Sequence, residues 1–498
     1  MTLLRSGVRA LRRVVIAAGA ALLALALFTP PASSVIPERA DSCATEPASA
    51  PLRYVVVFSE GTTRRQARRE ITGACGTQAE YYPEIAVAVA TSAEADFARR
   101  IGVDRAFSAQ AARRAHAGGG GRQQQRLTRE RRATTDRTRE QWNLRMINAD
   151  RAQRAGARGD RDVVVGVLDS GINARHPDLA DAVAPRLSAD CLTGSPETSP
   201  RAWRPTASPH GTHVAGIIAA ADDGIGITGV APETTLASIK VIGEQGYADP
   251  ESAVCGYMWA ARHDMRITNS SYFVDPWSLS CTNRDGLDVV REAIGRAVDH
   301  AADQGAVNVA AATNDATDLT PAVTGTGGGC EALPASLRSV VTVSATGKDR
   351  LKADYSSYGL GVISVTAPGG SGDACVLSTV PRGYRDLCGT SMAAPHVSGV
   401  LALLAAEHPN ASPERLHQRL TASTRQLPCP DDYDLTGDGT QDAYCTGYRA
   451  YNGFYGYGMV DAAAALGLSD DANDSHATSA SNATNGSNAT DVPADSRN

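Results

Sequence analysis

Residues 163–169 read Val-Val-Val-Gly-Val-Leu-Asp, a nearly continuous apolar run that ends in a carboxylate. Such a run predicts a strand buried on both faces, as in parallel sheets that helices cover on either side. Similar runs occur at 236–241, 307–312 and 340–343. Longer stretches compatible with helices separate the runs, at 212–221, 287–302 and 394–407. Strands alternating with helices predict an α/β fold with a mostly parallel sheet between two helical layers.

The length and charge of the chain limit what it can be. At 498 residues it exceeds one average domain, so we expect more than one folding unit. The formal net charge is −6 and 20% of the residues are charged, which leaves no overall positive field to attract nucleic acid. We therefore expect no nucleic-acid partner. The 47 glycines and 5% aromatic content favour tight turns and small-residue packing, as in α/β enzymes with long loops.

The amino terminus has the pattern of an export signal. Four arginines precede the apolar run 14–28, and the helix-breaking, small-residue stretch 29–34 follows it; these arginines are Arg5, Arg9, Arg12 and Arg13. A membrane anchor is the alternative, but this run is shorter than the ~20 apolar residues that a spanning helix needs. We predict a signal peptide at 1–34. We expect no stable membrane span and a mature protein outside the cytoplasm.

Cysteine usage agrees with export. The ten cysteines are an even number, which favours structural disulfides in an oxidising compartment. Catalytic thiols and a zinc site are the alternatives, but the sequence lacks tight cysteine pairs with matching pairs of histidines. Closeness along the chain predicts bridges between Cys375 and Cys388 and between Cys429 and Cys445, although sequence alone leaves the connectivity open.

Further segments flank the main domain, which we place at 141–467. Residues 50–110 alternate strand-like and helix-like patterns, which predicts a small β-α-β-β-α-β unit. Residues 111–140 are rich in Gly, Gln and Arg without apolar periodicity, which predicts an exposed linker. A nucleic-acid patch is the alternative for its arginines, but acidic residues are interleaved with them and aromatic partners are lacking. Residues 468–498 contain no core-forming pattern and predict a disordered polar tail.

Four polar residues stand where a site for amide hydrolysis needs them. Asp169 ends the first apolar run, at the sheet edge where α/β enzymes gather function. His210 begins His-Gly-Thr-His-Val-Ala-Gly, and Ser391 lies in Gly-Thr-Ser-Met-Ala-Ala-Pro-His, so each stands at a turn into a helix. Asn314 follows another apolar run and offers a side-chain amide. Taken singly, such residues are more often turn or cap residues, and His213 is an alternative base or metal ligand.

Together these residues match a known family. The segments around Asp169, His210, Asn314 and Ser391 resemble the signatures of the subtilisin family, and the resemblance extends from about 141 to 467. The chain order Asp, His, Ser is that of subtilisin and differs from the orders of chymotrypsin and the α/β-hydrolases. The resemblance implies that Ser391 is the nucleophile, His210 the general base, Asp169 the orienting carboxylate and Asn314 an oxyanion donor.

The resemblance also implies where the substrate binds. Family members lay an extended substrate strand against a backbone segment, and residues 267–273 occupy the matching place, with Ser271 and Tyr272 as substrate-binding residues. The family usually has a small glycine soon after this serine, whereas this chain has larger residues at 272–274. It also has Thr313 where a glycine commonly precedes the oxyanion asparagine. We expect these departures to change the S1 pocket.

A structural calcium ion is a further implication of the resemblance. Asp178 and the loop 221–227, with Asp223 in place of a familiar asparagine, resemble positions that hold calcium in many subtilisins. Solvated loop carboxylates are the alternative. The stretch 434–442 has spacing like that of an EF-hand but lacks the closing glutamate, so a tight acidic turn between cysteines is the preferred interpretation.

These observations predict a secreted serine endopeptidase that forms an acyl-enzyme on Ser391 and requires no cofactor for its chemistry. The unit at 50–110 resembles the inhibitory propeptides of the family, so we expect a zymogen that cleaves itself within 111–140. The expected partners are protein or peptide substrates and the propeptide, and we expect a monomer. Asp315 and Glu331 match the surroundings of S1, where carboxylates would favour basic side chains. A catalytically silent binding protein on the same scaffold is the competing hypothesis.

Overall fold

The computed structural model of the chain describes residues 43, 50–115, 135–276, 279–281, 285–321 and 329–468. The predicted signal peptide, the central part of the predicted linker and the predicted tail after Leu468 lie outside the described residues. The chain divides into two units, Met1–Cys43 and Ala44–Asn498, and the described helices and strands all belong to the second unit.

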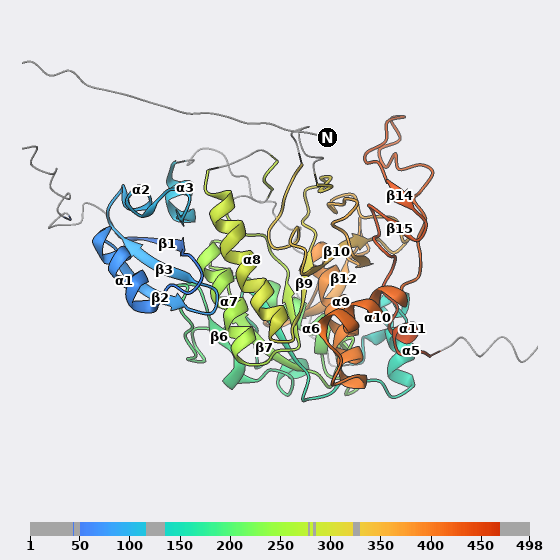
Figure 1. The fold of residues 1–498 in the computed structure, drawn as a ribbon. Helices are drawn as coiled ribbons and strands as arrows, with labels where there is room; N and C mark the ends of the chain where they lie inside the picture. Colours follow the sequence, from blue (N-terminus) through green and yellow to red (C-terminus); the bar gives the residue numbers. More distant parts are fainter. Residues whose placement is uncertain are drawn as a thin grey trace, which may run out of the picture. The chain divides into compact units, whose positions relative to one another are not determined.

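A seven-stranded sheet forms the centre of the main domain (Figure 1). Its strand order is β11-β10-β9-β8-β5-β7-β6. Every neighbouring pair of its strands is parallel. The strands are β5 (Val164–Asp169), β6 (Ala189–Asp190), β7 (Thr235–Lys240), β8 (Ile267–Ser270), β9 (Val307–Ala311), β10 (Val340–Thr346) and β11 (Val365–Pro368). The predicted apolar runs therefore form strands β5, β7, β9 and β10.

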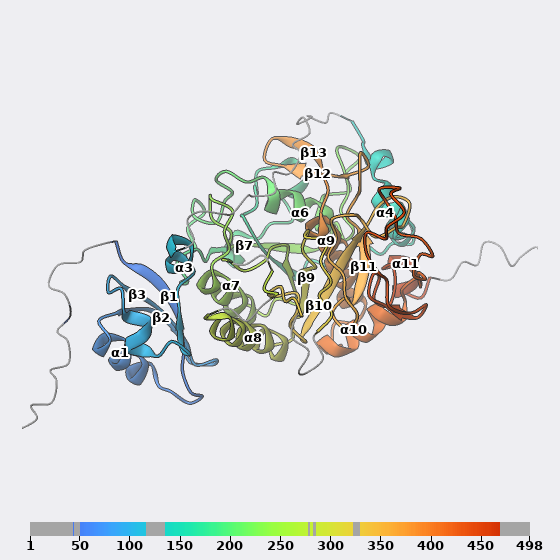
Figure 2. The ribbon, with the colours of Figure 1, turned by 90° about the horizontal axis from the view of Figure 1, so that it is seen from above.

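Helices pack on both faces of this sheet. Val165 and Val167 of β5 belong to one apolar core with α6 (His210–Ala219) and α9 (Thr390–Glu407). Leu168 belongs to a second core with α7 (Pro250–Arg262) and α8 (Leu287–Asp303), which lie side by side in Figure 2. Side chains alternate between the two faces of a strand, so β5 supplies both cores. The arrangement confirms the predicted three-layer α/β fold.

A separate four-stranded antiparallel sheet precedes this domain, with the order β2-β3-β1-β4. Its elements are β1 (Leu52–Val57), α1 (Arg64–Gly73), β2 (Thr77–Tyr82), β3 (Val87–Ser92), α2 (Phe97–Ile101), β4 (Ala106–Phe107) and α3 (Ala109–Ala115). One face packs on Ile71 and Phe97 of its own helices, and the other joins the core that contains α7 and α8. This strand order is that of a ferredoxin-like unit, as predicted, although the predicted linker region begins with the residues that end α3.

The remaining described elements follow the small sheet along the chain. They are α4 (Trp142–Met146), α5 (Ala149–Arg154), the hairpin β12 (Val376–Val380) and β13 (Gly383–Leu387), α10 (Pro413–Ala422), β14 (Gly447–Tyr448), β15 (Tyr451–Asn452), α11 (Ala462–Ala465) and three short 3-10 turns. The predicted bridges Cys375–Cys388 and Cys429–Cys445 are confirmed. Two further bridges, Cys191–Cys255 and Cys281–Cys330, are present. Within the described part of the chain no cysteine is free, and no helix is long and apolar enough to cross a membrane.

Candidate active site

The topology of the sheet places a site between β5 and β8. From β5 the chain continues through α6 to β7 on one side, whereas from β8 it continues through α8 to β9 on the other. Adjacent parallel strands whose connections diverge leave a crevice at their carboxyl ends, and ligands of open α/β sheets bind there. Asp169 is the last residue of β5, and Ser271 directly follows β8.

Asp169 and His210 form a close pair at this edge. The Nδ1 atom of His210 lies 2.9 Å from both carboxylate oxygens of Asp169. Asp169 is completely buried, and its Oδ1 also accepts a hydrogen bond from the amide of Ser170 at 2.6 Å. A carboxylate in this position holds the Nδ1 proton, which leaves Nε2 as the ring's proton acceptor.

The charge balance at His210 follows from this pairing. Burial disfavours the imidazolium, but the negative charge of Asp169 and its hydrogen bond act in the opposite direction. The net result is a pKa of His210 above its ordinary value of 6.5. The ring can therefore accept a proton from a neighbouring hydroxyl more readily than an unpaired histidine can.

Ser391 lies in the first turn of α9, the long helix that packs against strands β8 to β11. Its side chain is mostly buried, and its hydroxyl donates to the carbonyl of Ser271 at 3.3 Å. Within the described residues, Ser391 and His210 do not form a hydrogen bond. Catalytic hydrogen bonds are often long or misaligned until substrate is bound, and a rotation about the Cα–Cβ bond re-aims a serine hydroxyl.

Asn314 is held with its amide group available at the same edge. Its Oδ1 accepts hydrogen bonds from both the backbone amide and the hydroxyl of Thr390, each at 2.9 Å. Because the oxygen is engaged, the Nδ2 group is the end of the side chain that can donate to a ligand. Asn314 thus stands beside the amino terminus of α9, whose first backbone amides have no partner within the helix.

Thr313 gives the physical reason for the glycine that the family usually has before this asparagine. Its φ is +76°, in the left-handed region that glycine adopts without steric cost and β-branched residues rarely adopt. The hydroxyl of Thr313 is hydrogen-bonded to that of Ser357 at 2.8 Å, which helps to hold the backbone there. Thr313 therefore adopts a backbone conformation that suits glycine, and it adds a buried side chain at this position.

Comparison with known proteins decides the family. Residues 160–458 match the Subtilase family (Peptidase_S8). The chain belongs to the subtilase family. Its relatives include subtilisin DY from Bacillus licheniformis and subtilisin Savinase from Lederbergia lenta, each 33% identical over 57% of this chain. The matches span 92% and 91% of those two proteins.

Two solved structures share the subtilase fold. A lanthipeptide protease is 26% identical, with a TM-score of 0.53 over 66% of this chain and 96% of its own. An epidermin leader peptide processing serine protease from Staphylococcus aureus is 20% identical, with a TM-score of 0.63 over 85% of this chain and 99% of its own. The second likeness shows the fold alone. Family and relatives together identify a serine endopeptidase, and subtilases need no cofactor for catalysis.

A buried polar chain that sequence reasoning missed joins β8 of this subtilase to α9. The hydroxyl of Ser398 donates to Oδ1 of Asn269 at 2.8 Å, and Nδ2 of Asn269 donates to the hydroxyl of Ser271 at 2.9 Å. That hydroxyl in turn donates to the carbonyl of Ser391 at 3.0 Å. Asn269 and Ser398 are fully buried, so the two hydrogen bonds that cross to α9 hold β8 and α9 in register. An asparagine within the buried strand Ile267–Ser270 was the available signal.

The other histidines and acids considered from the sequence have structural partners. Nε2 of His213 lies 3.1 Å and 2.9 Å from the carbonyls of Val376 and Arg385, and burial lowers its pKa to about 3, so it stays neutral. Glu331 pairs with the guanidinium of Arg291, with Nε 2.8 Å from Oε1. Glu331 is therefore not an unpaired charge for a basic substrate.

The predicted substrate-binding residues differ in exposure. Ser271 and Tyr272 follow β8 directly and are mostly buried, and burial holds the pKa of Tyr272 well above 10. Phe273, the next residue, is 36% exposed and is one of the larger residues at 272–274, near which the family usually has a small glycine. Its side chain is a large apolar group that this segment presents to solvent. A change in the S1 pocket, caused by such larger residues, stays a prediction.

The residues predicted to hold calcium form a hydrogen-bonded turn. Oδ1 of Asp178 accepts from the hydroxyl of Tyr384 at 2.7 Å, and Oδ2 accepts from the amide of Ile227 at 3.2 Å. Asp223 accepts from the amide of Ile225 at 3.0 Å, within its own turn. Calcium takes six to eight oxygens. Among the described residues no group of three or more His, Cys, Asp or Glu side chains could hold a metal ion, and the calcium site stays a prediction.

Proposed function

We propose that this subtilase is an exported endopeptidase that hydrolyses peptide bonds through an acyl-enzyme on Ser391. In this mechanism His210 accepts the hydroxyl proton of Ser391 as the oxygen attacks the scissile carbonyl, and it then donates that proton to the leaving amine. Asp169 keeps the imidazole in the required tautomer. Nδ2 of Asn314 and the backbone amide of Ser391 donate to the oxyanion.

One observation carries this proposal. The imidazole of His210 lies 2.9 Å from both oxygens of a fully buried Asp169, at the crevice where Ser391 and Asn314 also stand. Burying a carboxylate is costly unless it is paired, so a buried Asp–His pair at a partly exposed edge favours a chemical role. The substrate backbone would then lie along residues 271–272, which continue the edge of β8.

We propose further that the chain is a zymogen. Residues 1–34 serve as a signal peptide, the unit at 50–110 as an inhibitor, and the segment 111–140 as the site of self-cleavage. The inhibitory unit packs its sheet on the core of α7 and α8, within the same compact unit as the enzyme. The described disulfides suit an extracellular location.

The test combines labelling with processing. We expect a fluorophosphonate to modify Ser391 in the secreted protein, and we expect a Ser391→Ala variant to accumulate at precursor size. A folded sample free of its amino-terminal unit that refused the label would instead support a catalytically silent binding protein. A Ser391→Ala variant that still reached mature size would place the processing in another enzyme.

The role of the enzyme depends on its substrates. Two solved relatives are described as a lanthipeptide protease and an epidermin leader peptide processing protease. Dedicated peptide processing is therefore a candidate role beside general protein degradation. Cleavage of a peptide library separates them, because a single sharp consensus indicates processing and an unselective profile indicates degradation.

A further inference from the structure

An arginine-binding cluster lies at the amino terminus of α7. Asp249 directly precedes this helix and Glu251 lies in its first turn. Two arginines from the amino-terminal unit reach them. Arg53 of β1 donates from Nε to Oε1 of Glu251 at 2.8 Å and from Nη2 to Oδ2 of Asp249 at 3.0 Å. Nη1 of Arg113, in α3, forms an ion pair of 2.7 Å with Oδ1 of Asp249.

Arg113 has the surroundings of a bound ligand. Its guanidinium carbon lies 4.4 Å from the ring centre of Tyr247, within the range of cation–π contacts, and one of its nitrogens faces Asp249. A planar, delocalised cation over an aromatic ring and beside a carboxylate is an arrangement that arginine makes and lysine makes poorly. The side chain of Arg113 is 21% exposed, so the contact is partly shielded from water.

The two carboxylates are buried where the amino-terminal unit contacts them. The side chain of Glu251 is 1% exposed, and its Oε2 has no hydrogen-bond partner among the described residues. Burial, with the nearby charge of Asp249, raises the pKa of Glu251 to about 7, although Arg53 opposes that shift. Departure of the unit would remove both guanidinium groups from the two carboxylates and the aromatic ring.

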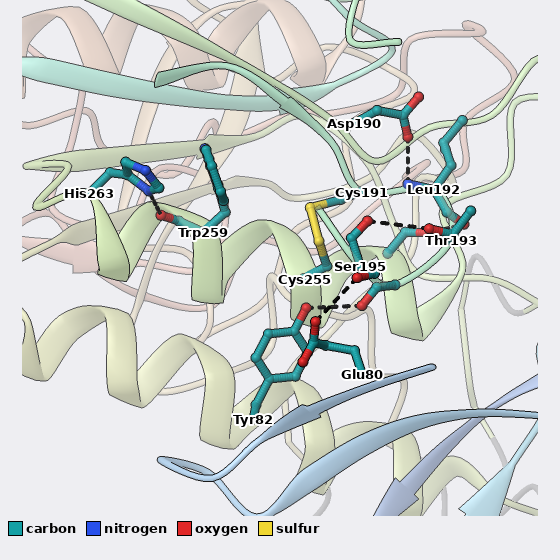
Figure 3. The surroundings of a disulfide bond; sticks show 12 residues. Glu80, Tyr82, Asp190, Cys191, Leu192, Thr193, Ser195, Cys255, Trp259 and His263 are labelled. Atoms are coloured by element: carbon teal, nitrogen blue, oxygen red, sulfur yellow. Dashed lines mark hydrogen bonds between the residues drawn. A yellow bond between two sulfur atoms is a disulfide. The ribbon is translucent and has the colours of Figure 1, made fainter. Parts of the chain in front are cut away.

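The frame of this site belongs to the enzyme and does not depend on the arginines. The amide of Ala248 donates to Oδ2 of Asp275 at 2.7 Å, and the amide of Ser252 donates to the carbonyl of Asp249 at 2.9 Å. The bridge Cys191–Cys255 ties α7 to the loop that receives Tyr82 of the amino-terminal unit, whose hydroxyl donates to the carbonyl of Gly194 at 2.9 Å (Figure 3). A site built this way keeps its geometry when its occupant leaves.

The arginine-binding cluster lies on a loop that starts at the catalytic edge of the sheet, where substrate would bind. The loop 241–249 follows β7 at the catalytic edge, and the amides of Val241 and Ile242 both donate to the carbonyl of Asp169. Arg113 is the third residue of the segment 111–140, in which we propose self-cleavage. For any cut after Arg113, the residue that fills the site lies on the amino-terminal side of the bond that is cut.

We infer that Tyr247, Asp249 and Glu251 form a subsite that selects an arginine side chain in substrates, amino-terminal to the scissile bond, once the amino-terminal unit has left. This inference deepens the proposed endopeptidase function and rests on it. In the precursor Arg113 occupies the subsite as the chain's own substrate-like residue. The site distinguishes guanidinium from ammonium and from neutral side chains by its ring and paired carboxylates.

The test is a scan of peptide substrates with the enzyme matured from the full chain. Quenched fluorescent peptides carry one arginine at each of the second to sixth positions before the cleaved bond. Matched peptides carry lysine or citrulline there, since citrulline has nearly the shape of arginine without its charge. At pH 8.5, where Glu251 is ionised, we expect kcat/KM for arginine to exceed that for citrulline about tenfold or more at one position.

Variants then assign the preference to these residues. In Asp249→Asn/Glu251→Gln the ratio should fall to about twofold or less, whereas Glu244→Gln, an exposed change on the same loop, should leave it intact. Should the double variant fail to mature, Tyr247→Leu should weaken the preference by itself. Wild-type enzyme that cleaves the peptides without preferring arginine at any position overturns the inference, as does a preference that survives in the double variant. Absence of both cleavage and labelling of Ser391 would instead refute the proposed function.

Discussion

Acid should destabilise this subtilase through His396, a buried histidine one turn after Ser391 in α9. Its Nδ1 lies 2.8 Å from the carbonyl of Met392, and its Nε2 lies 2.8 Å from Nδ2 of Asn143. These partners assign a neutral ring that donates from Nδ1 and accepts at Nε2. Burial lowers the pKa of His396 to about 4, although the hydrogen bond to Met392 acts in the opposite direction.

The size of the effect follows from this pKa. The unfolded chain protonates the ring below about pH 6.5, whereas the folded protein keeps it neutral until about pH 4. Between these values the unfolded state binds more protons, so the free energy of unfolding falls as the pH falls. At about 1.4 kcal/mol per pKa unit, lowering the pH from 7.5 to 4.5 should remove about 2–3 kcal/mol through this residue.

The measurement compares two inactive proteins, so that self-digestion does not interfere. Urea unfolding of the full chain carrying Ser391→Ala is followed at pH 7.5, 6.0 and 4.5. A second protein carries His396→Gln in addition, which supplies a neutral amide that does not titrate. We expect the first protein to lose about 2–3 kcal/mol more than the second over this range. Equal losses in the two proteins would refute the assignment of a neutral buried His396.

Four further outcomes follow from the site and its packing. Asp169→Asn should lower kcat about 10,000-fold while the fold persists, a magnitude known from the same change in another serine protease family, because an amide stabilises the wrong tautomer of His210. In the unaltered enzyme kcat/KM should fall with acid around a pKa above 6.5, since the raised pKa of His210 governs its supply of neutral base; an acid limb below pH 6 would contradict this. Asn314→Ala should lower kcat about 100- to 1,000-fold with little change in KM, the range found in subtilisin itself and not worked out from this structure. Gly216→Ala should lower the melting temperature, because the added carbon would lie 2.3 Å from the hydroxyl oxygen of Thr379 and 3.1 Å from its amide nitrogen; an unchanged melting temperature would show that this contact yields.

The elements that the sequence predicted correctly are those whose pattern is local. The run at 163–168 became the central strand β5 because every one of its side chains faces a helical layer, which a continuous apolar run encodes. By contrast, β2 has no apolar run of its own, because Thr77–Tyr82 pairs at the edge of the small sheet and buries only two of its six residues. An edge strand of this kind owes its extended form to its neighbour β3 and not to its composition.

The features of the candidate site also fall into two groups: those that local sequence motifs determine and those that depend on contacts between distant segments. The sequence by itself determined the family, the order of Asp169, His210 and Ser391, and two of the disulfides, because each depends on motifs or on closeness along the chain. Only the tertiary structure decided that Asp178 is satisfied by the hydroxyl of Tyr384, and that Asp249 and Glu251 meet arginines 136 or more positions away. Such pairings join elements that are distant in sequence. They form only after the chain has brought those elements together, because a buried charge needs a partner to offset the free energy of its burial.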